Sequence, residues 1–218
     1  MERLTQEEVD DRIKLHERWL KNGEIGYRPS FAHLDLSYME FKRANLYHAN
    51  FERSNLTGCN FRYANLNKAE LKGANLTKAI LKETNLFHAN LHEAVLKEVK
   101  VNEYTMFYFP ICPEEGEIIG YKKVDAGHRQ YAIVKLLIPA DARRNSATTY
   151  RCRADKAKVL QIKREDNTML NKAYSNHQSG FIYEVGKWLE IADFDEDRWH
   201  ETAPGIHFYL AENLAKCY

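Results

Sequence analysis

Large apolar residues recur at every fifth position of this chain from Phe31 to Val101. Fifteen positions keep this register: Phe31, Leu36, Phe41, Leu46, Phe51, Leu56, Phe61, Leu66, Leu71, Leu76, Leu81, Leu86, Leu91, Leu96 and Val101. An α-helix repeats about every 3.6 residues and a strand about every second residue, so neither places residues five apart on one surface. The segment therefore has its own supersecondary unit, and we expect it to coil as a solenoid.

A small residue and an Asn precede most of these large residues. The small residues are Ala44, Ala49, Ser54, Cys59, Ala64, Ala69, Ala74, Ala79, Thr84, Ala89 and Ala94, and the Asn residues are Asn45, Asn50, Asn55, Asn60, Asn65, Asn75, Asn85 and Asn90. Asn tolerates unusual backbone angles and can hydrogen-bond to a nearby turn. We therefore expect a corner in each repeat, with Asn contributing in both ways.

The runs ANLYH, ANFER, SNLTG, ANLNK, ANLTK and ANLHE resemble the pentapeptide-repeat family over about residues 29–103. The resemblance implies a right-handed, four-sided β-helix with four repeats in each coil and with the large and small residues pointing inward. Residues twenty apart then share a column at the strand spacing of about 4.8 Å. Phe31 is expected to stack on Phe51, and Phe41 on Phe61 along the opposite wall.

The outward residues predict two neighbouring faces on this β-helix. One face is basic, with Lys42, Arg43, Arg62, Tyr63 and Lys82 and with Glu83 as its exception; the next is aromatic and carries histidine, with Tyr47, His48, Asn67, Lys68, Phe87 and His88. These residues are either ordinary solvated positions or a partner-binding edge. The candidate contact residues of such an edge are Lys42, Arg62, Lys82, Tyr47, His48, Phe87 and His88.

Charge bears on one function of the pentapeptide-repeat family, which includes proteins that protect DNA gyrase against quinolones by mimicking duplex DNA. Such a mimic needs an acidic rod. Residues 29–103 hold ten Lys or Arg and eight Asp or Glu, a formal net charge of +2. The charge therefore disfavours a gyrase-directed DNA mimic, and the whole chain, at +1, is not basic enough to indicate nucleic-acid binding.

Other sequence features predict a cytoplasmic protein with no membrane association. The charged N-terminus, MERLTQEEVD, has no signal-peptide core, and no apolar stretch approaches the length of a membrane span. The four cysteines have no paired spacing, so we expect reduced thiols and neither a zinc site nor a disulfide framework.

A helix is predicted ahead of the β-helix, over residues 5–22. Thr5 and Glu8 form a capping box, and Leu4 and Val9 can form a hydrophobic staple. We expect this helix to cover the open edge of the first coil, and the apolar run from Tyr104 to Pro113 to form a second cap. The predicted organisation is an N-terminal capping helix (1–28), a pentapeptide-repeat β-helix with its C-terminal cap (29–113) and a small α+β domain (114–218), which together make a mainly β fold.

The C-terminal domain is predicted from runs rich in β-branched and aromatic residues. Expected strands cover 118–124, 131–138, 158–162, 181–184, 187–191 and 205–210, and a short helix covers 211–217. The stretches GFIYEVGKWLEI, DFDEDRW and APGIHFYLAENLAKCY resemble an uncharacterised domain found beside pentapeptide repeats in phage and bacterial proteins. This resemblance brings no established activity, but it suggests a phage or phage-derived origin.

Another resemblance concerns the last predicted strand. Gly205, Ile206, His207 and Phe208 are similar to the segment that frames the nicotinamide pocket in the ADP-ribosyltransferase fold, with Gly120, Tyr121 and Lys122 as its first pocket strand. That family carries a catalytic Glu downstream of this segment, and no Glu occupies that position here. The resemblance therefore implies a degenerate nucleotide or small-ligand pocket, and the alternative is plain core packing of Ile206 and Phe208.

A basic stretch adds candidates for binding an anion. Residues 140–158 carry Arg143, Arg144, Arg151, Arg153, Lys156 and Lys158 against only Asp141 and Asp155. Arg can bind a phosphate or carboxylate through two hydrogen bonds, or these residues can pair with the acidic turn at Asp193, Asp195 and Asp197. That turn lacks the Gly and Glu of a calcium loop, so no metal site is predicted. The candidate ligand-binding residues are Tyr121, Lys122, Arg143, Arg144, Arg151, Arg153 and His207.

No catalytic motif emerges from the sequence. Walker, GxSxG and HExxH patterns are absent, and no histidine has a Cys or Asp partner at diagnostic spacing. We therefore expect a non-enzymatic interaction or scaffold protein without a cofactor, in which a rigid β-helix presents a C-terminal binding domain. A protein partner is expected; a nucleotide or phosphate-containing small molecule and an oligomeric state remain open.

Overall fold

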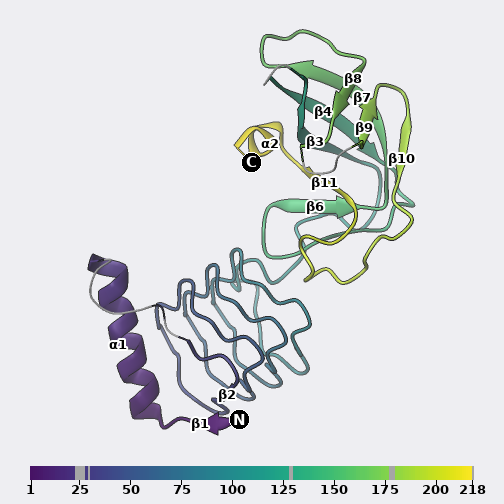
Figure 1. The fold of residues 1–218 in the computed structure, drawn as a ribbon. Coiled ribbons are helices and arrows are strands. Elements are labelled where there is room, and N and C mark those ends of the chain that lie inside the picture. Colours follow the sequence, from purple (N-terminus) through teal and green to yellow (C-terminus); the bar gives the residue numbers. More distant parts are fainter. Residues whose placement is uncertain (23–27, 29, 128–129, 177–179, 218) are drawn as a thin grey trace. The chain divides into compact units, whose positions relative to one another are not determined.

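The computed structural model describes residues 1–22, 28, 30–127, 130–176 and 180–217. The chain forms two compact units (Figure 1). Unit 1 comprises Met1–Phe109 and the short segment Trp199–Glu201, and unit 2 comprises Pro110–Arg198 and Thr202–Tyr218. The division at residue 110 lies just before the domain boundary expected at residue 114.

Residues twenty apart pair in parallel along the β-helix as far as Ile80 and Lys100, and the last pair, Asn85 with Met106, is twenty-one apart. Ser30 pairs with Asn50, Asn45 with Asn65 and Asn65 with Asn85, so four repeats complete each coil. The Phe31 and Phe51 rings stack with centroids 4.9 Å apart, and the Phe41 and Phe61 rings stack at 4.8 Å. The expected coil length and both aromatic columns are confirmed.

The corner of each repeat does not lie at the Asn. Positive φ angles occur two residues after each large residue from Phe31 to Leu96 instead, for example at Arg43 (φ 61), His48 (φ 61) and Lys68 (φ 57). The expectation of unusual backbone angles at Asn is therefore wrong, because Asn belongs to the paired ladder between coils. The expected hydrogen bond is present: the side-chain oxygen of Asn65 accepts the N–H of residue 67 at 3.1 Å.

Helix α1 (Gln6–Asn22) covers the first coil as expected (Figure 1). Its capping box is formed, since the Thr5 N–H donates to Glu8 Oε2 at 2.7 Å and the Glu8 N–H donates to Thr5 Oγ1 at 3.3 Å. Leu4 and Val9 are buried in one cluster with Phe31. Strand β1 (Glu2–Arg3) pairs in parallel with β2 (Leu34–Asp35), which extends the ladder of the first coil.

The apolar run after Val101 covers the last coil only in part. Phe107 and Tyr108 pack against the β-helix core, and so does Trp199. Tyr104, Met106 and Phe109 are exposed. The aromatic residues that cover this end of unit 1 therefore come from two distant parts of the sequence.

Unit 2 is built around one curved sheet (Figure 1). Its strands are β3 (Ile118–Asp125), β4 (Tyr131–Ile138), β5 (Arg144–Ser146), β6 (Arg151–Ala154), β7 (Lys156–Arg164), β8 (Lys172–Tyr174), β9 (Ile182–Glu184), β10 (Trp188–Glu190) and β11 (Ile206–Tyr209). The main path runs β10-β7-β4-β3-β11-β6-β5, with β8 pairing to β3 and β9. All six expected strands and the closing helix α2 (Glu212–Cys217) are confirmed, whereas β5, β6 and β8 were not predicted.

The core of unit 2 lies on one face of this sheet. Val124, Val134 and Leu136 contribute from β3 and β4, and Phe208 contributes from β11. A Cβ on Gly120 would lie 2.5 Å from Phe208 Cδ2, so the absence of a side chain at residue 120 makes room for this ring. Plain core packing is therefore the role of Phe208, as it is of Ile206.

Candidate anion-binding site in unit 2

One edge of β3 changes its partner strand partway along its length. On this edge Tyr121 pairs with Tyr209 of β11, whereas Asp125 pairs with Tyr174 of β8. Among the described residues, no strand pairs with this edge between these two points. The Lys123 carbonyl there accepts a hydrogen bond from the Asn176 side-chain amide at 3.5 Å. The sheet therefore has a gap beside Lys122 and Lys123.

A pocket of about 590 Å³ lies at this gap. Its wall includes Lys122, Arg151 and His207, three of the residues that the sequence singled out. Lys122 lies opposite the buried Val134 and so belongs to the core face, whereas Arg151 and His207 belong to strands whose Cys152 and Phe208 face the core. The pocket therefore joins side chains from both faces of the sheet, because the sheet is interrupted here.

Lys122 is a partly buried cation without a counterion in the part of the chain that the structure describes. Among the described residues its ammonium forms neither a hydrogen bond nor an ion pair, and burial, followed by repulsion from Arg151, lowers its pKa to about 8. The charged residues that line the pocket are Lys122, Lys123, Arg151 and Asp193, which gives three cations against one carboxylate. The local field therefore favours an anion in this pocket.

His207 contributes a neutral imidazole to the pocket. Its Nε2 lies 3.1 Å from the Ala203 carbonyl oxygen, which can only accept, so Nε2 carries the hydrogen and Nδ1 is an acceptor. Nδ1 is buried without a hydrogen-bond partner among the described residues. Burial and then Arg151 lower the pKa of His207 to about 4, which keeps the ring uncharged at neutral pH.

Arg153 lies outside the pocket and binds backbone carbonyls of the segment before β11. Its guanidinium donates to the carbonyls of Asp195 at 2.8 Å, Asp197 at 3.1 Å and Pro204 at 3.4 Å, and it lies 5.1 Å from the centre of the Phe194 ring. The side chain is almost fully buried. Arg153 thus holds the 193–204 segment against β6.

The remaining candidates also lie away from the pocket wall. Arg143 forms ion pairs with Asp155 at 2.8 Å and with Glu196 at 3.2 Å. Glu196 lies in the acidic turn, between Asp195 and Asp197. Arg144 donates to the Pro139 carbonyl at 3.5 Å. Tyr121 lies beside Tyr209 in the sheet but does not line the pocket.

The structure adds apolar and aromatic residues that the sequence did not single out, and it brings Asp193 of the predicted acidic turn into the pocket wall. Phe181, Tyr183 and Ile191 form an apolar part of the wall, and Asp193 adds its carboxylate. Burial raises the pKa of Tyr183. No local pattern distinguishes these residues from ordinary strand positions, because their proximity to Lys122 depends on pairing between distant strands.

Another hollow, of about 690 Å³, lies between α2, β4 and the end of β7. It is lined by both signs of charge, with Lys216 paired to Glu212 at 2.8 Å and with Lys163 and Glu165 nearby. Lys123 reaches it as well and donates to the Lys216 carbonyl at 3.0 Å. The charges in this hollow compensate one another, so it offers less to an anion than the pocket at Lys122.

Within the described residues, no three His, Cys, Asp or Glu side chains are placed to hold a metal ion. In the acidic turn, Asp195 Oδ1 accepts the Asp197 N–H at 2.8 Å. The backbone carbonyls of Asp195 and Asp197 bind Arg153, as described above. The turn is thus organised by hydrogen bonds within unit 2.

The two predicted faces of the β-helix contain many contacts within the faces themselves. On the basic face, Arg43 and Arg62 lie 5.5 Å and 5.4 Å from the centre of the Tyr63 ring, and Arg62 pairs with Glu83 at 3.5 Å. On the aromatic face, the Lys68 ammonium lies 5.6 Å from the centre of the Tyr47 ring.

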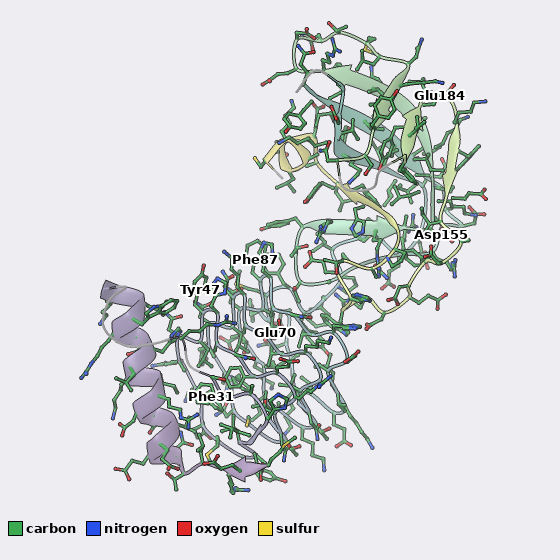
Figure 2. The ribbon with its side chains drawn as sticks, viewed as in Figure 1. Phe31, Tyr47, Glu70, Phe87, Asp155 and Glu184 are labelled. Atoms are coloured by element: carbon green, nitrogen blue, oxygen red, sulfur yellow. The ribbon has the colours of Figure 1, made fainter. Side chains whose placement is uncertain are left out.

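Tyr47 and Phe87 lie on the same side of unit 1 (Figure 2). Their rings contact the neighbouring His48 and His88, with centroids 4.6 Å and 4.3 Å apart. Lys42 is exposed, and Lys82 is partly exposed. The partner-binding edge therefore stays a prediction.

None of the helices that the structure describes has the length and apolar character needed to cross a membrane.

Two family models match the chain, one for each unit. Residues 30–62, 54–92 and 64–101 match a model of pentapeptide repeats. Residues 108–215 match a family of unknown function (DUF5758). No curated protein matches the chain.

Several solved structures resemble the repeat region. A pentapeptide repeat protein from the thylakoid lumen of Arabidopsis thaliana is 33% identical over 33% of this chain and 50% of that chain, with a TM-score of 0.32. One from the cyanobacterium Cyanothece 51142 is 34% identical over 34% of this chain and 54% of that chain, with a TM-score of 0.25. The plasmid-mediated fluoroquinolone resistance protein QnrB1 is 17% identical over 34% of this chain and 44% of that chain, with a TM-score of 0.18. The chain spans about half the length of the first two relatives.

Proposed function

Because the chain consists of a pentapeptide-repeat β-helix followed by an uncharacterised domain, we propose that it is a non-enzymatic binding protein whose C-terminal domain takes a small anionic ligand. The β-helix acts as a rigid scaffold that carries this domain. The ligand is a nucleotide or another phosphate-containing small molecule, and its site is the pocket formed by Lys122, Arg151 and His207.

One observation carries this proposal: Lys122 is a partly buried ammonium without a counterion among the described residues. A buried charge is costly unless it is paired, and the neighbouring charge of Arg151 adds repulsion. An anion in the pocket would neutralise the Lys122 ammonium. The aromatic wall of Phe181 and Tyr183 supplies a surface for a base or another ring.

The pocket has the size and composition of a small-molecule site. Its volume of about 590 Å³ is within the range of about 300–1,000 Å³ that is usual for such sites. The His207 imidazole adds a neutral polar ring to the wall, because burial keeps its pKa at about 4. The mixture of cationic, aromatic and neutral polar groups supports binding and does not form a catalytic constellation.

Isothermal titration calorimetry with ATP, ADP and inorganic phosphate tests the proposal on the full chain. Lys122→Met and Arg151→Gln should each weaken binding at least tenfold, because each removes one cation from the pocket. The matched controls are Lys172→Met and Arg143→Gln, which lie in the same unit outside the pocket. Absence of heat with all three probes at millimolar concentration would refute the proposed function.

A further inference from the structure

Lys122 differs from an ordinary anion-binding lysine in its chemical environment. It lies on the core face of β3, opposite the fully buried Val134, and Tyr183 and Phe181 line the same pocket. Among the described residues no carboxylate, carbonyl or hydroxyl binds its ammonium. The amine is therefore held in a partly apolar wall with nothing to stabilise its charged form.

Such an environment favours the uncharged, nucleophilic amine. Burial is the larger cause and repulsion from Arg151 the smaller cause of a pKa lowered to about 8. At pH 8 about half of such amines are uncharged, against about one in three hundred for an amine at the ordinary value of 10.5. Desolvation and a neighbouring cation are the two means by which proteins activate a lysine for attack on a carbonyl carbon.

The other titratable groups of the pocket are not placed to act as the nucleophilic amine. They are Lys123, Arg151, Asp193, Tyr183, Tyr209 and His207. The Lys123 ammonium donates a hydrogen bond to the Lys216 carbonyl, so this side chain is engaged in the neighbouring hollow. Burial keeps Tyr183 protonated by raising its pKa, and it keeps His207 uncharged by lowering its pKa to about 4. Lys122 is thus the amine of this wall that is available to a ligand.

We propose that Lys122 forms an imine with the ligand, and that the ligand is an aldehyde or ketone that also carries a phosphate or carboxylate group. This proposal rests on the anion-binding function proposed above, since Arg151 would bind the anionic group while the carbonyl faces Lys122. The amine nitrogen attacks the carbonyl carbon to give a carbinolamine. Loss of the former carbonyl oxygen with both amine hydrogens releases one water and leaves a carbon–nitrogen double bond. No oxidant, metal or further reactant is needed.

Pyridoxal phosphate and pyridoxal are suitable probes when Lys122 is compared with Lys123 within each reaction, because pyridoxal lacks the phosphate and its cyclic hemiacetal slows its reaction at every lysine alike. The full chain is incubated with each probe, reduced with sodium borohydride to convert the imine into a stable secondary amine, and digested for peptide mass mapping. Pyridoxal phosphate should modify Lys122 at least tenfold more than Lys123, and pyridoxal should lose most of this preference. The rate at Lys122 should rise with pH and level off above about pH 8.

Variants separate this inference from the proposed function. Lys122→Arg keeps the cation but cannot form an imine, so it should retain calorimetric binding of inorganic phosphate while losing modification at residue 122. Arg151→Gln should reduce the preference of pyridoxal phosphate for Lys122 over Lys123 towards that seen with pyridoxal. Lys172→Arg, outside the pocket in the same unit, is the matched control and should leave modification of Lys122 unchanged.

Two outcomes would overturn the inference. Equal modification of Lys122 and Lys123 would show that Lys122 has no special reactivity, and an equal preference for Lys122 with the two aldehydes would show that the anion plays no part. If phosphate binds by calorimetry and either result is obtained, imine formation fails while anion binding stands. If none of ATP, ADP and inorganic phosphate binds to the wild-type chain, the proposed function fails as well.

Discussion

Phe51 occupies the centre of the aromatic part of the β-helix core, and its replacement tests how the coils hold together. The ring is fully buried. It stacks on Phe31 with centroids 4.9 Å apart, and it meets the edges of Phe41 at 5.6 Å and Phe61 at 5.9 Å. The same column carries Leu in the next two coils, at Leu71 and Leu91, so Leu is a conservative replacement for Phe51.

Replacing Phe51 with Ala and replacing it with Leu should lower the free energy of unfolding by amounts that differ by several kcal/mol. Truncating a buried Phe to Ala costs about 3–5 kcal/mol through lost transfer energy and the cavity left behind. Each aromatic pair contributes about 0.5–1.5 kcal/mol beyond burial, and Phe51 has three such neighbours. We expect Phe51→Ala to cost about 5 kcal/mol and Phe51→Leu about 1.5 kcal/mol, because Leu fills most of the space and loses chiefly the ring contacts.

Hydrogen exchange with mass spectrometry at increasing urea concentration measures this loss segment by segment. Peptides covering residues 44–66 should lose protection, whereas peptides from β4 in unit 2 serve as an internal reference. Tyr104→Ala is the matched control, since Tyr104 is exposed and should change stability by no more than about 0.5 kcal/mol. A loss below about 2 kcal/mol for Phe51→Ala, or equal losses for Ala and Leu, would refute the reasoning.

Three further predictions concern unit 2. Gly120→Ala should lower its stability by about 1–3 kcal/mol in thermal denaturation, because the new Cβ would meet the buried Phe208 ring at 2.5 Å; an unchanged melting temperature would contradict this. Arg153→Met should cost about 2–4 kcal/mol and release the 195–204 segment first in hydrogen exchange, since three backbone carbonyls lose their charged donor; uniform protection would argue against this anchoring role. The pKa of Lys122 is about 8 in the folded chain and 10.5 in the unfolded chain, so between these pH values the unfolded chain binds more protons. The free energy of unfolding of the wild type should therefore rise with pH across that window, by up to about 3 kcal/mol. Lys122→Met should be more stable than wild type at pH 7 and should lose this rise, and a flat wild-type profile would contradict the low pKa.

Much of unit 1 could be predicted because its contacts repeat at a fixed sequence distance. Once four repeats make a coil, every inward residue contacts the one twenty positions away, and the Phe columns follow from the sequence alone. The turn was harder to place. Positive φ falls on Arg43, His48 and Lys68, which have no preference for it, because the coil geometry fixes the angle whatever the side chain is.

The site in unit 2 was predictable only in part, because it depends on pairing between distant strands. Lys122 and His207 were singled out through a resemblance, but the gap between them arises where β3 changes its partner from β11 to β8. Strand β6 was missed because its Arg residues concealed an alternation in which Cys152 and Ala154 face the core. Pairing with the acidic turn was one of the two predicted roles of Arg153, but its partners there are backbone carbonyls, more than forty residues along the chain, and not carboxylates.

The twenty-residue column limits how a β-helix of this kind can change its length during evolution. A one-residue insertion would shift every later large side chain unless the extra residue loops out, as it does where Asn85 pairs with Met106, twenty-one residues along the chain. A five-residue insertion would rotate every later outward column by one side of the square. A twenty-residue insertion would restore every column and add one coil. Outward surfaces on this scaffold should therefore be gained or lost in whole coils, so that a duplication extends the existing columns and leaves the core unchanged.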